Sequence, residues 1–386
     1  MYYDIIKCLI LTIQLVIAKQ HINNNTLNSS FESKQNKRKS IIWAILFIVI
    51  AAASIYAVKK VSGEFSFKNL VRLIRGAAPI PVIMAFCASL IYISFQGLSI
   101  KTLLRSFGQK KSVWQCISYS AADIYFSAIT PSATGGQPAC GYLMIRDGVP
   151  ASCTTICLVA NWATYTLSII IIGIATLIAF PQVFNYFSTF AKILICLGAA
   201  FLLTAGLLGL LVAMKRSAID ALERFVLKTG KKLRIIKSRE TEAEIMQWVV
   251  DYRNYSTQLK GHIPGLIRSL IFNIIQRFAF ISITMFMYIA VNLNRSPFSM
   301  SQIIFTGASL LGAQALISIG STFIPIPGSM GYTDLMMLNA FSSLMDDSKA
   351  AGLELMSRSV AFYFSVIICF IITAITLLSK KKNSDI

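Results

Sequence analysis

Long hydrophobic stretches alternate with shorter polar segments along most of this chain. A helix needs about 20 apolar residues to cross the hydrocarbon core of a bilayer. Six stretches meet or approach this length, and each is predicted to be a membrane-spanning helix: 41–58, 79–98, 152–180, 190–214, 264–291 and 357–379. The predicted fold class is therefore all-α, a polytopic membrane helix bundle with about six full spans.

Two further stretches are apolar but interrupted by polar and small residues. Segment 302–324 is long enough to cross a bilayer, yet it contains three glycines, three serines and Gln314. Segment 113–130 carries Gln115, Asp123 and several serines. Neither pattern is typical of a helix that faces lipid on all sides.

Composition supports the membrane assignment and excludes other classes. Only 13% of the 386 residues are charged, against about 25% in soluble domains. The apolar content is too high for a disordered chain. The formal charge of +20 lies between long apolar runs, so the expected partners are the membrane and an anionic phospholipid, and no nucleic acid is expected to bind directly.

Lysine and arginine gather on one side of the predicted topology. Segment 215–262 has eleven, 19–40 has five, 99–112 has four and the tail 380–386 has three. The opposing loops have fewer in total, although 59–78 has five. By the positive-inside rule, we expect a multi-pass plasma-membrane protein whose connector 215–262 and C-terminus are cytoplasmic.

This orientation constrains the two interrupted stretches. Segment 113–151 must leave and return to the cytoplasmic face, and 302–356 must leave and return to the external face. Each contains a break rich in proline and glycine, at Thr130–Pro138 and at Ile324–Gly331. We expect two re-entrant helical hairpins of inverted orientation. In the alternative, each break is a tight loop between two full spans, but that would disperse the charge asymmetry.

Breaks of this kind mark transport sites, because irregular backbone at membrane depth survives only inside protein or beside a wet cavity. Proline ends one half-helix, and glycine lets the backbone approach a ligand closely. The N-terminus of the next half-helix could then cradle a phosphate. The candidate lipid-headgroup site comprises Asp123, Ser132, Thr134, Gly135, Gly136, Gln137, Pro138, Arg146, Arg277, Pro325, Pro327, Gly328, Gly331, Asp334 and Arg358.

The ionisable members of this set are functional candidates because they lie inside apolar segments. Asp123 lies about two turns before the first break, and Asp334 falls in the first turn after the second. Arg277 lies in the middle of a span. For Arg146 and Arg358 the alternative is that the side chain extends to the lipid headgroups. Asn161, Trp162 and Tyr165 either line a cavity or form a packed polar seam.

The chain is expected to divide into an N-terminal short apolar segment with a polar basic linker at 1–40, a membrane domain at 41–379 and a basic cytoplasmic tail at 380–386. Helical spacing in 215–262 predicts two amphipathic helices at the membrane surface around the basic turn Lys228–Arg239. The eight cysteines contain no CxxC pair, so we expect buried thiols rather than a metal site. No cofactor, metal or catalytic group is predicted, and no GxxxxGK[ST] motif for ATP occurs.

Both breaks resemble motifs of a known family. The run Ser132 to Pro138, SATGGQP, with the following Gly141-Tyr142 and Arg146-Asp147-Gly148-Val149, resembles a signature of the lysylphosphatidylglycerol synthase transmembrane region, a flippase-like membrane family. Pro325 to Asp334 is similar to its PxPGGxGxxE motif, with Ser329 for the second glycine and Asp334 for the acid. The resemblance covers about residues 41–379.

The resemblance implies a membrane domain that moves a phospholipid or lipid-linked headgroup, such as lysyl-phosphatidylglycerol, between leaflets. Two alternatives remain open: phosphatidylglycerol lysyltransferase activity, and a membrane scaffold for a separate aminoacyltransferase or glycosyltransferase. The largest predicted extramembrane segment, 215–262, has 48 residues. This is too few for an acyltransferase domain, so we expect that this chain alone is not the transferase.

Overall fold

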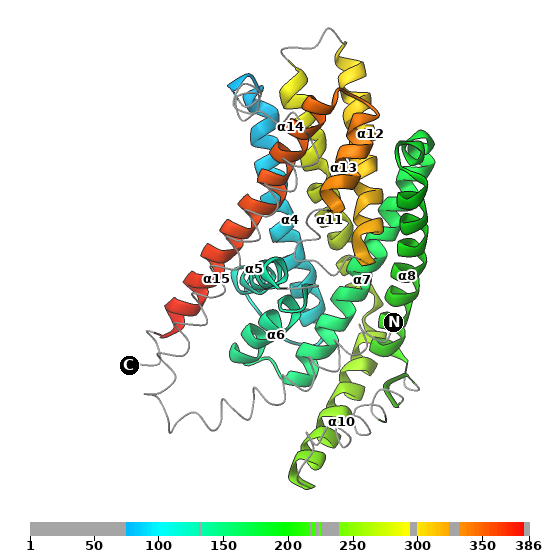
Figure 1. Cartoon of the computed structure of the whole chain (residues 1–386). Coiled ribbons are helices and arrows are strands. Elements are labelled where there is room, and N and C mark those ends of the chain that lie inside the picture. Colours follow the sequence, from blue (N-terminus) through cyan, green and yellow to red (C-terminus); the bar gives the residue numbers. More distant parts are fainter. Residues whose placement is uncertain are drawn as a thin grey trace.

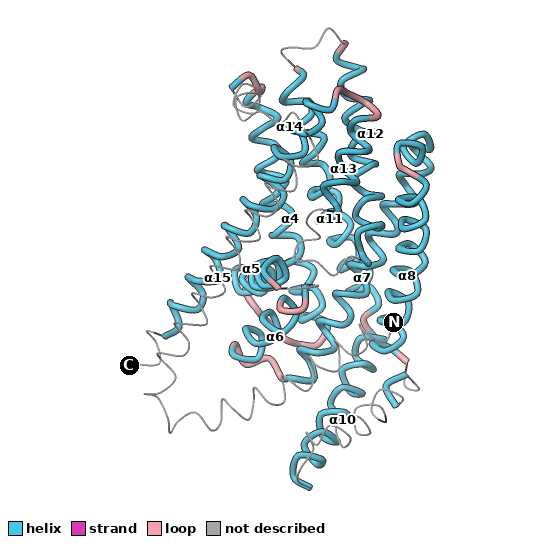
Figure 2. Tube along the Cα trace, in the orientation of Figure 1, coloured by secondary structure: helices cyan, strands magenta, loops and turns pink. Residues whose placement is uncertain are grey.

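The fold is known from a computed structural model that describes residues 75–130, 133–215, 218–220, 224, 239–293, 299–323 and 332–381. Within these ranges there is no strand (Figure 2), so the predicted all-α class is confirmed. The α-helices are α4 (Pro79–Ser106), α5 (Val113–Ile129), α6 (Gly136–Arg146), α7 (Ala151–Ala179), α8 (Thr189–Met214), α10 (Arg239–Gly261), α11 (Ile263–Asn292), α12 (Met300–Gly320), α13 (Tyr332–Ser342), α14 (Asp347–Arg358) and α15 (Ser365–Lys381). Shorter elements are η2 (Pro181–Tyr186), η3 (Ser321–Phe323) and the π-helix η5 (Ser359–Phe364).

Six helices in the described ranges are long and apolar enough to cross a membrane. Five correspond to predicted spans: α4, α7, α8, α11 and the continuous helix Lys349–Leu378, which contains most of α14 and α15. The sixth is α12, the stretch predicted as one limb of a hairpin. Two thirds of its most apolar window is buried inside the bundle, which fits the glycine and serine content of its sequence. The predicted span 41–58 lies outside the described residues.

Two helix pairs lie toward opposite ends of the bundle. Figure 1 shows α5 and α6 toward the end that carries α10, and α12 and α13 toward the other end. At 1.5 Å per residue, the 17 residues of α5 extend about 25 Å and the 11 residues of α6 about 16 Å. Neither is among the six candidate spans. The first break joins α5 to α6, and the second falls at 324–331, outside the described residues.

Small residues allow the helices to pack closely. A Cβ added at Gly97 of α4 would lie 2.9 Å from the Cys116 carbonyl oxygen of α5. A Cβ at Gly198 of α8 would overlap the carbonyl oxygen of Ile319 in α12. Close approach of this kind is how helices associate in a bilayer, where apolar burial alone gives little driving force. These contacts fix α5 against α4 and α12 against α8.

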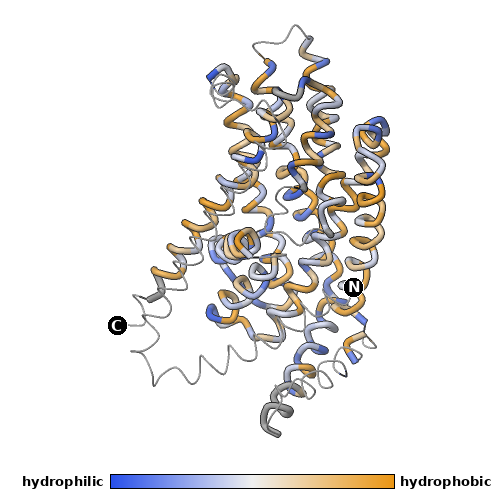
Figure 3. The backbone as a smooth tube through the Cα atoms, viewed as in Figure 1, coloured by the Kyte–Doolittle hydropathy of each residue, from blue (hydrophilic) through white to orange (hydrophobic). Residues whose placement is uncertain are grey.

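The most lipid-exposed helices are α8 and α15. Hydrophobic residues follow both along their length in Figure 3. Only about a third of the most apolar window of α8 is buried, although its mean hydropathy is 2.5. By contrast, more than half of the most apolar window of α11 is buried. The reason is that α11 packs in the interior against α4, α7 and α12.

The connector 215–262 contains α10 at one end of the bundle (Figure 1). Trp248, Val249 and Tyr252 form its apolar face, and all three are buried. Tyr252 donates a hydrogen bond to the Val212 carbonyl of α8 at 3.3 Å. Arg253 pairs with Asp220 at 2.8 Å. Most of the first predicted amphipathic helix and the basic turn lie outside the described residues.

Candidate functional site

The first break turns the chain sharply between α5 and α6. Ala133 has a φ of 53°, the left-handed region that side chains rarely adopt. Thr130 closes the turn: its hydroxyl donates to the Phe126 carbonyl at 2.6 Å and accepts from the Gly135 N–H at 2.8 Å. Pro138 falls in the first turn of α6, where a helix tolerates proline. Pro131 and Ser132 lie outside the described residues.

Gly136 brings the start of α6 directly against Asp123 of α5. A Cβ at this position would overlap the Asp123 carboxyl oxygen Oδ1 and the Ser127 hydroxyl. The positive end of a helix favours a nearby carboxylate. Asp123 therefore occupies the N-terminal end of α6, where the sequence predicted a phosphate cradle. Thr134 is exposed, whereas Gln137 is half-buried in the first turn of α6.

Asp123 belongs to a chain of buried polar side chains that joins four helices. Its Oδ2 accepts a hydrogen bond from Gln96 of α4 at 2.6 Å, and Ser127 also bonds to it. Gln96 in turn accepts from Gln276 of α11 at 3.0 Å. The side chains of Asp123, Gln96 and Gln276 are all buried. Together with Gly136, they link α6, α5, α4 and α11 at a single polar junction.

A second polar group ties α4 and α11 to α7. Ser99 donates to Asn161 Oδ1 at 2.6 Å and lies 2.7 Å from the Ser269 hydroxyl. Asn273 donates to Thr164 at 2.9 Å. All five side chains are buried and bonded to one another. Of the two roles open for Asn161, the contacts favour a packed polar seam.

Arg277 follows Gln276 of the polar junction in sequence but has a different environment. Its guanidinium donates to the Tyr165 hydroxyl at 3.1 Å and lies over the rings of Tyr165 and Phe280, at 5.4 and 5.0 Å from the ring centres. It is 7% exposed. Within the described ranges no carboxylate forms an ion pair with it. Arginine has five N–H donors, so this buried cation retains capacity for an anion.

The third cluster joins α13 to α14. Asp334, in the first turn of α13, forms a buried ion pair with Arg358 at the end of α14. Glu354, one turn earlier on α14, has Oε1 3.9 Å from the same guanidinium. Arg358 also lies over the Phe362 ring of η5. Sequence reasoning missed Glu354 because the last span was predicted to begin at 357; its i, i+4 spacing to Arg358 was the available signal.

Arg146 lies apart from these clusters. It is near Asp147 at 3.8 Å and donates to the Thr376 carbonyl of α15 at 3.3 Å. Asp147 accepts from Tyr119 and Gln115 of α5, at 2.8 and 3.2 Å. The pair therefore holds α6 to α5 and α15 near the end of the bundle that carries α10. The structure does not bring Arg146 together with Arg277, and Pro325, Pro327, Gly328 and Gly331 lie outside the described residues.

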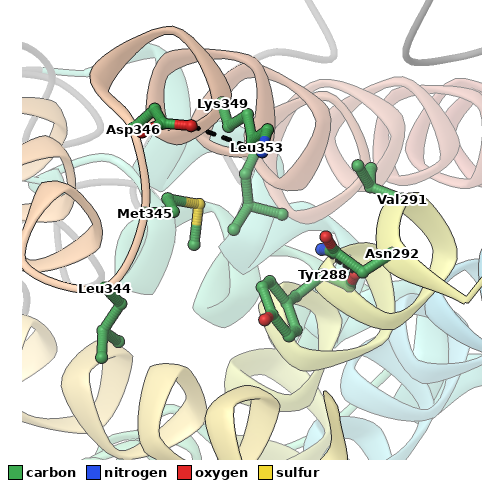
Figure 4. Close-up of a pocket in the computed structure, with 8 residues that line it drawn as sticks. All are labelled: Tyr288, Val291, Asn292, Leu344, Met345, Asp346, Lys349 and Leu353. Atoms are coloured by element: carbon green, nitrogen blue, oxygen red, sulfur yellow. Dashed lines mark hydrogen bonds and ion pairs between the residues drawn. The ribbon is translucent and has the colours of Figure 1, made fainter. Parts of the chain in front are cut away.

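A cavity of about 240 Å³ opens at the opposite end of the bundle. Figure 4 shows Asp346 and Lys349, which pair at 3.4 Å, on one side and Tyr288 and Asn292 of α11 on another. No residue of the candidate site lines this cavity. In the described part of the chain no group of three or more His, Cys, Asp or Glu side chains could hold a metal ion.

Comparison with known proteins gives one family. A family model described as "Lysylphosphatidylglycerol synthase TM region" matches residues 41–369, which is most of the chain. No curated protein matches the sequence. The matched range contains both breaks, the junction at Asp123 and the cluster at Arg358.

Proposed function

Because the chain belongs to the lysylphosphatidylglycerol synthase transmembrane family, we propose that it translocates an anionic phospholipid or a lipid-linked headgroup between the two leaflets. Lysyl-phosphatidylglycerol is an example of such a lipid. The proposal rests most directly on Arg277, a buried cation with aromatic and hydroxyl contacts and no ion-pair partner among the described residues. Charges inside membrane domains usually mark a substrate path.

In this proposal the two helix pairs are re-entrant hairpins that meet inside the bilayer. The short lengths of α5, α6 and α13 and the opposite positions of the two pairs support this arrangement (Figure 1). The Lys/Arg distribution favours a plasma-membrane orientation with α10 in the cytoplasm. Cysteine substitutions at Gly135 and Gly328 test it: we expect both to be shielded from membrane-impermeant reagents, and free labelling of both from water would contradict it.

Arg277 is proposed to contact the headgroup phosphate. A charge-assisted hydrogen bond contributes about 1.5–3 kcal/mol, so its loss corresponds to about a tenfold or greater change in rate. The test is translocation of fluorescent phosphatidylglycerol by the purified chain in vesicles. We expect Arg277→Gln to slow translocation by about this factor. Arg268→Gln is the matched control, since Arg268 lies on the same helix but is exposed.

The outcome also separates this function from its alternatives. Equal rates for Arg277→Gln and the control would remove Arg277 from the path. No translocation by the unmodified chain would reject the proposed function. If a synthase then co-purified with the chain, a scaffold role would be favoured. Lysyl transfer from charged tRNA to phosphatidylglycerol by the purified chain would instead indicate the transferase.

A further inference from the structure

The cluster around Arg358 holds two acids and one base in the bundle interior. Glu354 is fully buried, and Asp334 and Arg358 are 2% and 7% exposed. Arg358 forms its close ion pair with Asp334, whereas Glu354 Oε1 is 3.9 Å from the guanidinium, beyond hydrogen-bond distance. Neither oxygen of Glu354 has a hydrogen-bond partner among the described residues, and the same holds for the Ser357 hydroxyl. A buried polar group without partners calls for an explanation.

Among the described residues, no cation other than Arg358 forms an ion pair with Glu354. From α13 the titratable group that faces α14 is Asp334. From α11 it is Tyr288, whose hydroxyl bonds to Thr306, and from η5 it is Tyr363, which bonds to Arg358. On α14 itself, Lys349 is exposed and paired with Asp346. Within the described part of the bundle, a single guanidinium therefore serves two carboxyl groups.

A carboxylate in such a place is expensive unless it is paired or carries a proton. We propose that Glu354 is a proton-binding residue that couples lipid translocation to proton movement across the membrane. When Glu354 carries the proton, Asp334 is the one charged carboxylate beside Arg358 among the described residues. When the proton leaves, the Glu354 carboxylate competes with Asp334 for Arg358. The proton enters from one aqueous side and leaves to the other, and no other bond is made or broken.

The position of Arg358 gives this competition a structural consequence. Asp334 begins α13, whereas Glu354 and Arg358 end α14, and the π-helix η5 starts at the next residue. Single π turns inside α-helices often lie at functional sites. Beyond η5, α15 packs against α5 and accepts the Arg146 hydrogen bond. A shift of Arg358 from Asp334 to Glu354 would therefore loosen α13 from the helix that also contacts α5 and α6.

This inference rests on the proposed translocation, and its main test uses the same vesicles with an imposed pH gradient. For one proton moved per lipid, a gradient of about one pH unit changes the leaflet distribution of the lipid about tenfold. We expect this shift in the unmodified chain and in Asp346→Asn, whose exposed carboxyl group lies immediately before α14. In Glu354→Gln, which mimics the protonated group, the shift should be lost while lipid exchange continues.

Two further measurements keep the outcomes distinct. Translocation that ignores the pH gradient, without proton flux reported by a dye inside the vesicles, would overturn the inference and leave the proposed function intact. Should translocation itself be absent, infrared spectroscopy of the purified chain still decides. We expect an absorption band from a protonated carboxyl group that disappears in Glu354→Gln and persists in Asp346→Asn. A band unchanged by both substitutions would overturn the inference.

Discussion

Gly136 and Asp123 are in direct contact, and no space for a Cβ remains between them. This contact makes the first break a joint between two helices rather than a loose loop. Gly136 permits α6 to start against the side of α5, and Asp123 places its carboxyl group at the start of α6. The glycine is needed because of this close approach.

The first prediction concerns that contact. Gly136→Ala introduces a methyl group that overlaps the Asp123 carboxyl and the Ser127 hydroxyl. Overpacking of this kind costs about 1–3 kcal/mol, so we expect thermal unfolding in detergent to occur at a clearly lower temperature. Gly261→Ala is the control, because a Cβ there meets nothing within 4 Å. Equal melting temperatures for the two variants would show that α6 does not start against Asp123.

A second prediction tests the polar junction through Gln96. This side chain donates to Asp123 and accepts from Gln276, so the two contacts share one group. Residues in one hydrogen-bond network show interaction energies of about 0.5–3 kcal/mol in double-mutant cycles. We expect a value in this range between Asp123→Asn and Gln276→Leu, measured from the unfolding of single and double variants.

The control for this cycle combines Asp123→Asn with Trp248→Phe on α10. Trp248 belongs to the cluster that packs α10 against the bundle and shares no hydrogen bond with Asp123. The effects of these two substitutions on stability should add. Additive effects for Gln276→Leu as well would mean that Gln96 does not connect the two residues.

Comparison of sequence and structure shows which features were readable in advance. The starts of α4, α7, α8 and α11 were predicted to within a residue, because hydrophobic length alone defines a span. The end of α4 was placed at 98 rather than Ser106. The extra residues include Ser99, whose polar side chain is satisfied by Asn161 and Ser269. Hydropathy undervalues a polar helix end that neighbouring helices cover.

The site was less predictable for a related reason. Asp123 was found because a carboxyl group near a glycine-rich break is unusual in an apolar segment. Its partner Gln276 is linked to it only through Gln96, which is 180 residues away from Gln276 in sequence. Contacts of this kind depend on how α4 packs against α11. Glu354 was missed because α14 begins at 347, well before the predicted start of the last span.

A third prediction concerns the hydroxyl that positions Arg277. Tyr165→Phe removes the hydrogen bond to Arg277 but keeps the ring beneath the guanidinium. A net loss of about 0.5–1.5 kcal/mol in stability is expected for one such bond. Tyr165→Leu also removes the cation–π contact, which contributes about 2 kcal/mol when desolvated, and should lower the melting temperature further. If the two variants melt at the same temperature, the ring does not support Arg277.

The final prediction separates the charge of the buried Asp334–Arg358 pair from its packing. Asp334→Asn leaves Arg358 without its close carboxylate, and breaking one side of a buried pair costs about 3–5 kcal/mol. Asp334→Leu combined with Arg358→Met replaces the pair by apolar groups, which is often neutral or stabilising. We therefore expect the double variant to melt at a higher temperature than Asp334→Asn.

Translocation by the double variant should nevertheless lose its response to the pH gradient, because Glu354 then has no guanidinium to compete for. A double variant that is as unstable as Asp334→Asn would show that Arg358 is held by its packing against Phe362 rather than by Asp334.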